Sequence, residues 1–165
     1  SLRERIAPGH FVFPDQFIDR TTKRINTFFD GSDVRHVSMG EPFCSGIRSC
    51  LVEACKSLRF EHHNGGTVVT IEGPRFSTKA ESMMFRSWGC DIINMSTVPE
   101  IVLARELDLK YQSMAMSTDY DCWHESEEEV TMEMIYAVME KNVNNVKKLI
   151  GQVIPLISKQ IGKEN

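Results

Sequence analysis

Residues 67–78, TVVTIEGPRFST, decide the fold that this sequence predicts. The first five, Thr67 to Ile71, are all β-branched, which is typical of a strand because such side chains pack well on a pleated surface. A Glu-Gly-Pro turn follows, and Ser77 or Thr78 can cap a helix that runs to about Trp88. A buried strand that leads through a short turn into a helix is the repeating unit of an α/β sheet.

The same alternation continues toward the C-terminus. Residues 91–96 predict a second short strand, and Pro99 lies in the first turn of a second helix, where its missing N–H does no harm. Residues 113–117 predict a third strand, and a last helix is expected from about Ser126 to Val153. Strands and helices thus alternate three times, which predicts an α/β fold: a mixed β-sheet flanked by helices.

The remaining segments predict a strand, a loop, a helix and a turn. Residues 10–13 are expected to form a short strand, and the apolar spacing within 47–58 predicts a helix. Residues 22–37 form a polar loop that nevertheless carries two phenylalanines, which favours docking on a partner. Residues 62–66, HHNGG, predict a turn. The last helix is expected to bury one apolar face, made of Val130, Met134, Val138, Val146 and Ile150.

Composition places the chain among ordinary globular proteins. A length of 165 residues predicts a single domain, 1–165, and the net charge of −4 gives no reason to expect nucleic acid. No apolar run approaches the roughly 20 residues that a membrane helix needs. The five cysteines lack a C-x-x-C pair, which argues against a disulfide framework or a zinc site and favours a reducing, cytoplasmic compartment. We expect no metal, no nucleic acid and no membrane as partners.

Two carboxylates one residue apart, Asp119 and Asp121, follow the third predicted strand. In an extended segment, side chains at i and i+2 point to the same side, so both can face one ligand. Carboxylates held that close resist ionising together, and the one that keeps its proton can act as an acid. The structural alternative is a polar loop that caps the next helix.

Polar and aromatic side chains follow all three predicted strands, at residues 72–78, 94–97 and 118–123. Ligands bind beyond the carboxyl ends of strands in α/β sheets, so we expect these segments to form one small-molecule pocket. Within it, Arg75 is expected either to bind phosphate or to form an ion pair. Cys122 is a candidate thiol, although no neighbouring histidine in the sequence activates it.

Ordered motifs at these strand ends resemble the trimeric purine nucleoside phosphorylase family and, within it, the branch that acts on S-methyl-5′-thioadenosine. The motifs are EGPRFS (72–77), NMSTVPE (94–100) and TDYD (118–121), with DQFIDRT (15–21) and EPFC (41–44) matching that branch as well. The resemblance extends from Ser1 to about Pro155. It implies a phosphorylase/nucleosidase-like domain of which this chain is the C-terminal portion, without the N-terminal part of the sheet.

The resemblance also implies an activity. Such enzymes are pentosyltransferases that cleave methylthioadenosine with phosphate, giving adenine and 5-methylthioribose 1-phosphate in purine and methionine salvage. Phosphate is a co-substrate, and no cofactor is expected. The family further implies a homotrimer with sites shared between subunits, in the cytoplasm or the nucleus.

Site residues follow from the resemblance position by position. It assigns substrate contacts to Phe76, Ser77, Met95, Ser96, Thr118, Asp119 and Asp121, with Ser96 also contacting phosphate. Met132 and Ile135 would line the pocket for the methylthio group, and His36 would reach into the site of a neighbouring subunit.

The two carboxylates suit adenine. A protonated carboxyl can donate to the purine N7 while an ionised one accepts from the 6-amino group. We expect Asp119 at N7 and Asp121 at the amine, although the two roles can be exchanged. A 6-oxopurine presents an acceptor at position 6, and the relatives that use such bases carry asparagine in place of the first aspartate.

Two departures from the family leave alternatives open. The glycine-bearing phosphate loop and the Arg-His segment of the family do not occur in this sequence, so this chain alone is expected to be an incomplete catalyst. Ser96 and Met132 stand where threonine and a smaller aliphatic residue are usual. The alternatives are a phosphorylase for 6-oxopurine nucleosides and a non-catalytic nucleoside-binding fragment.

Overall fold

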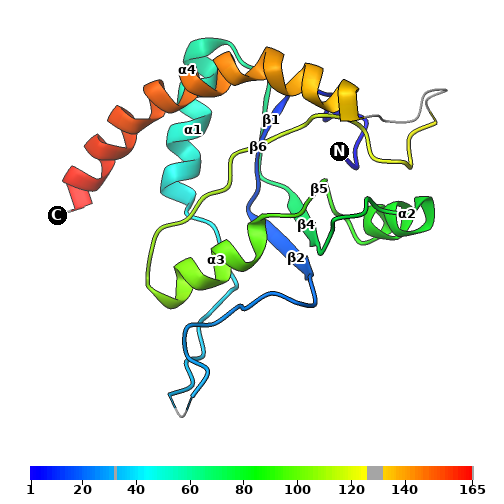
Figure 1. Ribbon diagram of the computed structural model, residues 1–165. Helices are drawn as coiled ribbons and strands as arrows, with labels where there is room; N and C mark the ends of the chain where they lie inside the picture. Colours follow the sequence, from blue (N-terminus) through cyan, green and yellow to red (C-terminus); the bar gives the residue numbers. More distant parts are fainter. Residues whose placement is uncertain (32, 126–131, 165) are drawn as a thin grey trace.

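The computed structural model describes residues 1–31, 33–125 and 132–164 (Figure 1). Within these ranges the strands are β1 (Phe11–Phe13), β2 (Gln16–Arg20), β3 (His62–Asn64), β4 (Thr67–Ile71), β5 (Ile92–Asn94) and β6 (Ala115–Met116). The helices are α1 (Ser45–Leu58), α2 (Lys79–Ser87), α3 (Thr97–Glu106) and α4 (Met132–Glu164). The α/β alternation predicted after residue 67 is confirmed.

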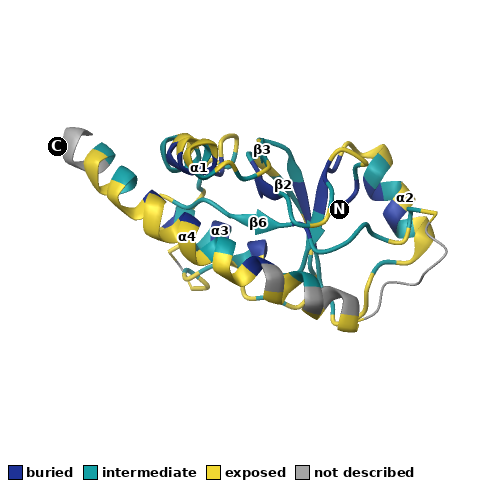
Figure 2. Ribbon diagram, turned by 90° about the horizontal axis from the view of Figure 1, so that it is seen from above, coloured by how far each residue is buried: buried dark blue, intermediate teal, exposed yellow. Residues whose placement is uncertain are grey.

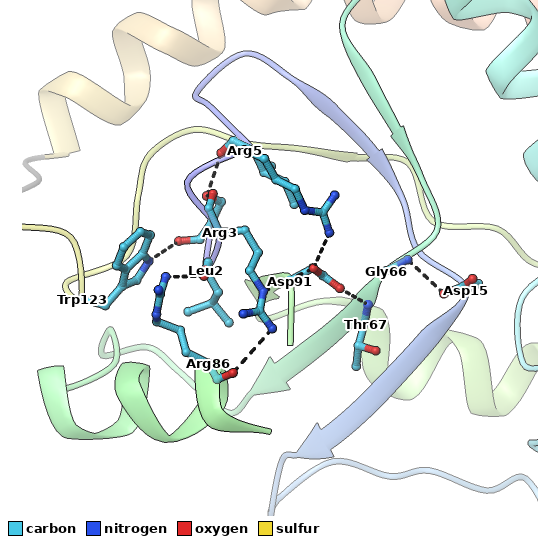
Figure 3. Close-up of polar contacts among 11 residues, drawn as sticks. Leu2, Arg3, Arg5, Asp15, Gly66, Thr67, Arg86, Asp91 and Trp123 are labelled. Atoms are coloured by element: carbon cyan, nitrogen blue, oxygen red, sulfur yellow. Dashed lines mark hydrogen bonds and ion pairs between the residues drawn. The ribbon is translucent and has the colours of Figure 1, made fainter. Parts of the chain in front are cut away.

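The strands form two three-stranded sheets, and the chain passes directly from the first sheet to the second between β1 and β2. In the first sheet, β1 pairs in parallel with β3 and antiparallel with β6; in the second, β4 pairs in parallel with β2 and β5. Only Pro14 and Asp15 separate β1 from β2. The Asp15 N–H donates to the Gly66 carbonyl at 3.1 Å, and the Gly66 N–H donates to the Asp15 carboxylate at 2.9 Å (Figure 3). Parallel and antiparallel pairs thus both occur, as expected for a mixed sheet, but the antiparallel pair lies in the first sheet only, and the chain passes from one sheet to the other at this junction.

Helices cover both faces of β4, which explains its uninterrupted β-branched sequence. Val68 packs in a cluster with Val98 and Ile101 of α3, whereas Val69 packs with Phe85 of α2. Both valines are fully buried. Figure 2 shows that the strands are mostly buried or intermediate, whereas exposed residues lie mostly on the helices and loops. A strand buried on both faces needs apolar residues at successive positions rather than alternating ones.

The prediction of a turn at residues 62–66 is wrong in its first half. His62–Asn64 forms β3, with His62 opposite Phe11 and His63 opposite Val12 in the parallel pair with β1. The backbone N–H and C=O groups of β1 provide hydrogen-bond partners whatever side chains β3 carries, so a tertiary pairing overrides the weak strand propensity of histidine and asparagine.

The predicted buried face of the last helix is also partly wrong. Leu149 and Val153 of α4 are buried against α1 and β1, with Val146 packed at the edge of the same cluster. Ile150, expected in the core, is 42% exposed. The helix carries apolar residues on more than one side, so periodicity alone did not select the side that α1 covers. Val130 lies outside the described residues, as does the side chain of Met134.

None of the described helices is both long and apolar enough to cross a membrane.

Candidate active site

One cavity of about 680 Å³ lies where the ends of β4 and β5 approach the segment after β6 and the start of α4. Its volume is in the range of small-molecule sites. The structure brings together around it most of the candidate residues: Phe76, Ser77, Met95, Ser96, Thr118, Asp119, Asp121 and Met132. The three segments meet although β6 belongs to the other sheet and runs antiparallel to β1. The expected arrangement, in which all three segments follow strands of one sheet, therefore holds only for β4 and β5.

The first wall, residues 72–78, continues β4 and turns into α2. Gly73 has φ of +73°, and a Cβ at this position would lie 2.6 Å from the Met95 sulfur. The left-handed backbone conformation favours glycine at this position, and a Cβ would displace the flexible Met95 side chain that lines the cavity. Thr78 caps α2: its hydroxyl accepts from the Glu81 N–H at 3.2 Å, and the Glu81 carboxylate accepts from the Thr78 N–H at 2.7 Å. This capping box presents Phe76 and Ser77 to the cavity.

Arg75 forms an ion pair instead of pointing to a phosphate site. Its guanidinium donates to both carboxylate oxygens of Glu81 at 2.7 Å. The paired Arg75 and the Thr78 N–H lower the pKa of Glu81 to about 2. Of the two roles considered for Arg75, the structural one is observed.

The second wall is the end of β5, where Asn94 organises a polar network. The Thr70 hydroxyl donates to Asn94 Oδ1 at 3.0 Å, and Asn94 Nδ2 donates to the Thr97 hydroxyl at 2.7 Å. Both threonines are buried, so these bonds satisfy polar groups that the core would otherwise leave unpaired. The network fixes the turn that places Met95 and the exposed Ser96 at the cavity.

The third wall, residues 118–123, carries the two aspartates, and both line the cavity. The Thr118 hydroxyl donates to Asp119 Oδ1 at 2.6 Å. Asp121 Oδ2 is buried and has no hydrogen-bond partner among the described residues, and the same is true of the Ser77 hydroxyl. A buried carboxylate oxygen without a donor is costly, and a bound molecule that offers an N–H would satisfy it.

Cys122, next to Asp121, is not activated. Burial and then the nearby Asp121 charge raise the pKa of its thiol, which donates to the Ser77 carbonyl at 3.3 Å. A thiol with a raised pKa remains protonated near neutral pH and is a poor nucleophile.

Helix α4 closes the cavity with methionines. Met132, 45% exposed, lines it as expected, and so does Met139, which sequence reasoning did not select. The two lie seven positions apart, two helical turns, so the same face of α4 carries both. The side chain of Ile135 lies outside the described part of the chain.

His36 does not join the cavity of its own chain among the described residues. It is exposed on the loop 22–37, which extends away from the sheets (Figure 1). The base of this loop is nonetheless tied to the first wall. The Glu72 carboxylate accepts from the backbone N–H groups of Thr22 and Lys23 at 2.6 and 3.1 Å, and Arg24 donates to the Glu72 carbonyl at 3.0 Å.

Ser1 also lines the cavity, and sequence reasoning gave no reason to place it there. Its carbonyl oxygen accepts from the Asp121 N–H at 2.9 Å, and its backbone nitrogen donates to the Asp119 carbonyl. Nothing in the sequence near Ser1 or Asp121 predicts a contact between these two positions, which lie 120 residues apart.

Comparison with known proteins identifies relatives of the chain. The profile of the phosphorylase superfamily matches residues 1–155. S-methyl-5′-thioadenosine phosphorylase of Danio rerio is 54% identical over 162 residues, which make up 95% of this chain and 58% of that relative. The enzyme of the same name from Aedes aegypti is 55% identical over 163 residues, which cover 96% of this chain and 58% of the relative.

Solved structures that resemble this chain include enzymes of the same kind as these two relatives. Methylthioadenosine phosphorylase from Schistosoma mansoni in complex with adenine matches with a TM-score of 0.90 at 39% identity, covering 96% of this chain and 63% of that one. The chain thus spans 58% of the length of the first two relatives and 63% of this third one.

Proposed function

This chain belongs to the phosphorylase superfamily, and from that premise we propose that the protein containing it cleaves S-methyl-5′-thioadenosine with phosphate. The products are adenine and 5-methylthioribose 1-phosphate, which makes the protein a pentosyltransferase of purine and methionine salvage. Phosphate is the co-substrate, and the reaction needs no further cofactor.

The observation that carries this proposal is the unpaired, buried Asp121 Oδ2 beside Asp119 in one cavity. Asp121, ionised, accepts from the 6-amino group of adenine, which supplies the missing donor. Asp119, protonated, donates to N7. The exchanged assignment remains open, but Asp119 Oδ1 already has the Thr118 hydroxyl as a donor, so the greater need for an external N–H lies at Asp121.

The reaction then follows from charge. As the bond between C1′ and N9 breaks, its electron pair moves into the purine, and the proton from Asp119 arrives at N7 so that adenine leaves as a neutral base. A phosphate oxygen forms the new bond to C1′. In this proposal the Ser96 hydroxyl contacts phosphate or ribose, Phe76 packs on the nucleoside, and Met132 contacts the methylthio group; all three residues line the cavity. The family resemblance implies further phosphate ligands in segments of the relatives that this chain does not span.

We further propose that subunits assemble as a homotrimer through the loop 22–37, with His36 entering the neighbouring site. Apolar Ile25, Phe28 and Val34 are 81%, 54% and 64% exposed on this loop, which a partner surface would cover. The Glu72 contacts at the loop base would join that interface to the catalytic wall. Light scattering on the whole protein checks the assembly, and a monomer with full activity contradicts shared sites. The five free thiols suit the cytoplasm, with the nucleus as a second location.

The test compares substrates in the full-length protein. We expect phosphate-dependent adenine release from methylthioadenosine, and much slower hypoxanthine release from inosine, because a 6-oxo group presents an acceptor to the Asp121 carboxylate. Faster turnover of inosine supports the 6-oxopurine phosphorylase. Adenine binding without turnover at any phosphate concentration supports a non-catalytic nucleoside-binding protein.

A further inference from the structure

The aspartate-bearing wall 118–123 has little regular structure of its own to hold it. The preceding strand β6 has only two residues, and the wall lies beyond its last one. A general acid must nevertheless stay within hydrogen-bond reach of the atom that it protonates. Whatever holds this wall therefore bears directly on catalysis.

Residues 1–5, which we call the strap, contact this wall through Ser1, which also lines the cavity. One atom, the Ser1 carbonyl oxygen, accepts two hydrogen bonds at 2.9 Å: from the Asp121 N–H and from the Trp123 indole N–H. Both donors belong to the wall and lie on either side of Cys122. The carbonyl thereby fixes the backbone of Asp121 relative to a large side chain two residues further on.

Arg86 of α2 holds both parts of this contact in place. Its guanidinium lies 3.5 Å from the centre of the Trp123 ring and donates to the Leu2 carbonyl at 2.6 Å. Figure 3 shows Leu2 and Arg3 between Trp123 and Arg86 on one side and Asp91 on the other. Stacking of a cation on an indole and a bond to a carbonyl leave the Trp123 ring little freedom to turn away from Ser1.

The other side of the strap is anchored by Asp91. Its Oδ1 accepts from Arg5 at 2.7 Å and pairs with Arg3 at 3.4 Å, while Oδ2 accepts from the Thr67 N–H at 2.9 Å. The Leu2 N–H donates to the Asp91 carbonyl at 2.9 Å, and the Leu2 side chain is fully buried beside Val69 and Phe85. The strap is thus fixed to the start of β4, the most regular part of the sheet.

Neither Arg86 nor Trp123 lines the cavity that holds the aspartates, as far as the described residues show. They line a second, more open hollow of about 450 Å³ with Glu4 and His124, behind the wall. Their hydrogen bonds to Ser1 and Leu2 link them to the backbone of Asp121 through the strap.

We propose that Trp123 and Arg86 are positioning residues: through the Ser1 carbonyl they hold the Asp119–Asp121 wall in the geometry that protonates the purine. The inference rests on the proposed function and names residues that make it efficient. A misplacement of about 1 Å at a reacting group costs about 100-fold in rate, so a loosened strap is expected to lower turnover sharply.

The test uses Trp123→Phe in the full-length protein. This change keeps an aromatic ring beneath Arg86 but removes the N–H that donates to Ser1, together with part of the ring area; the control variant carries the same loss of ring area. The matched control is Trp88→Phe, the same change at the C-terminal end of α2, where Trp88 packs on Phe85. Arg86→Lys is the second variant, because lysine keeps the charge but not the planar contact.

We expect Trp123→Phe to lower kcat about 10- to 100-fold, with a smaller change in KM and an altered pH profile of kcat. The melting temperature should match that of Trp88→Phe. Hydrogen exchange at the Asp121 amide should be faster by about tenfold, because its acceptor is held less firmly. Unchanged exchange and an unchanged kcat relative to Trp88→Phe overturn the proposal.

The amide readout separates two kinds of failure. Wild-type protein that releases no adenine refutes the proposed function, while the exchange rate of the Asp121 amide in Trp123→Phe still decides whether the strap holds the wall. Faster exchange with unchanged kcat also overturns the positioning role, because the wall would then be loosened without consequence.

Discussion

The first and third walls of the cavity are held in different ways. Residues 72–78 lie between two regular elements, since β4 precedes them and the capping box between Thr78 and Glu81 follows, and the bonds of Glu72 to the base of the loop 22–37 add to this. Residues 118–123 are fixed by the strap, with a separation of 122 positions between Trp123 and Ser1. The first wall, which the sequence predicts well, presents Phe76 and Ser77 to the cavity. The third wall, which carries the two aspartates, depends on tertiary contacts. Because the strap bonds to the backbone of Asp121 and to the side chain of Trp123, the Asp121 carboxylate oxygen Oδ2 needs no role in holding the loop and can bind a ligand.

The largest expected effect comes from removing the acid. Asp119→Asn keeps the shape of the side chain but cannot deliver a proton to N7, so turnover of methylthioadenosine in the full-length protein should fall by about 10²- to 10⁴-fold. Adenine release measures it. Asp108→Asn is the control, since Asp108 is exposed after α3 with φ of +54°, a conformation that asparagine adopts readily. Unchanged turnover in Asp119→Asn would refute the acid role.

The second effect tests the link between the two walls. Asp91 has a side chain only 12% exposed and binds the Thr67 N–H together with Arg3 and Arg5. Asp91→Asn loses the charge and turns one acceptor into a donor facing other donors. We expect the free energy of unfolding to fall by about 2–3 kcal/mol. Urea unfolding measures it, with Asp108→Asn again as the control.

That variant should also lower activity, because the strap and the start of β4 both depend on Asp91. A stable Asp91→Asn protein with wild-type kcat would show that the walls are independent.

The third effect is confined to the locally held wall. Thr78→Ala removes the cap of α2 and should destabilise the protein by about 1 kcal/mol, with adenine release much less affected than in Trp123→Phe. Thermal unfolding of the variant and of wild-type protein measures this loss of stability. Thr78→Ser, which keeps the hydroxyl, should stay near the wild-type value; equal losses in both variants would refute the capping role.

The smallest effect is a pH dependence of the same cap. The pKa of Glu81 is lowered to about 2 in the folded protein, from 4.5. A lowered folded-state pKa means that the carboxylate stabilises the fold fully above about pH 4.5 and loses this effect as pH falls toward 2. Glu81 lies at the surface, so solvent screening keeps the effect small.

Unfolding midpoints between pH 7 and pH 3 provide the test, on wild-type protein and Glu81→Gln. The difference between the unfolding midpoints of wild-type protein and Glu81→Gln should become smaller as the pH falls. A difference between the two midpoints that stays constant from pH 7 to pH 3 would contradict the claim that the ionised Glu81 carboxylate stabilises the start of α2.

Prediction from sequence succeeded where the physics is local. β-branched residues at 67–71 predicted β4, and the candidate caps Ser77 and Thr78 predicted the start of α2, where Thr78 is the cap observed. The pattern of two aspartates one residue apart indicated a shared ligand, and both residues line the cavity. It failed at His62–Asn64 and at Ile150, where the partner of a strand and the covered side of a helix depended on distant elements.

The sequence by itself determined the alternation of strands and helices after residue 67, the turn that follows β4 and the chemical groups of the cavity, because these depend on residues within a few positions of each other. It did not determine β2 or β3, which depend on pairing with distant strands. The tertiary structure decided that β6 pairs antiparallel with β1 and that Arg75 is held by Glu81. It also decided that the Ser1 carbonyl holds Asp121. The reason is physical: a backbone carbonyl carries the same hydrogen-bonding capacity at every residue, so its partner is chosen only when folding brings distant segments together.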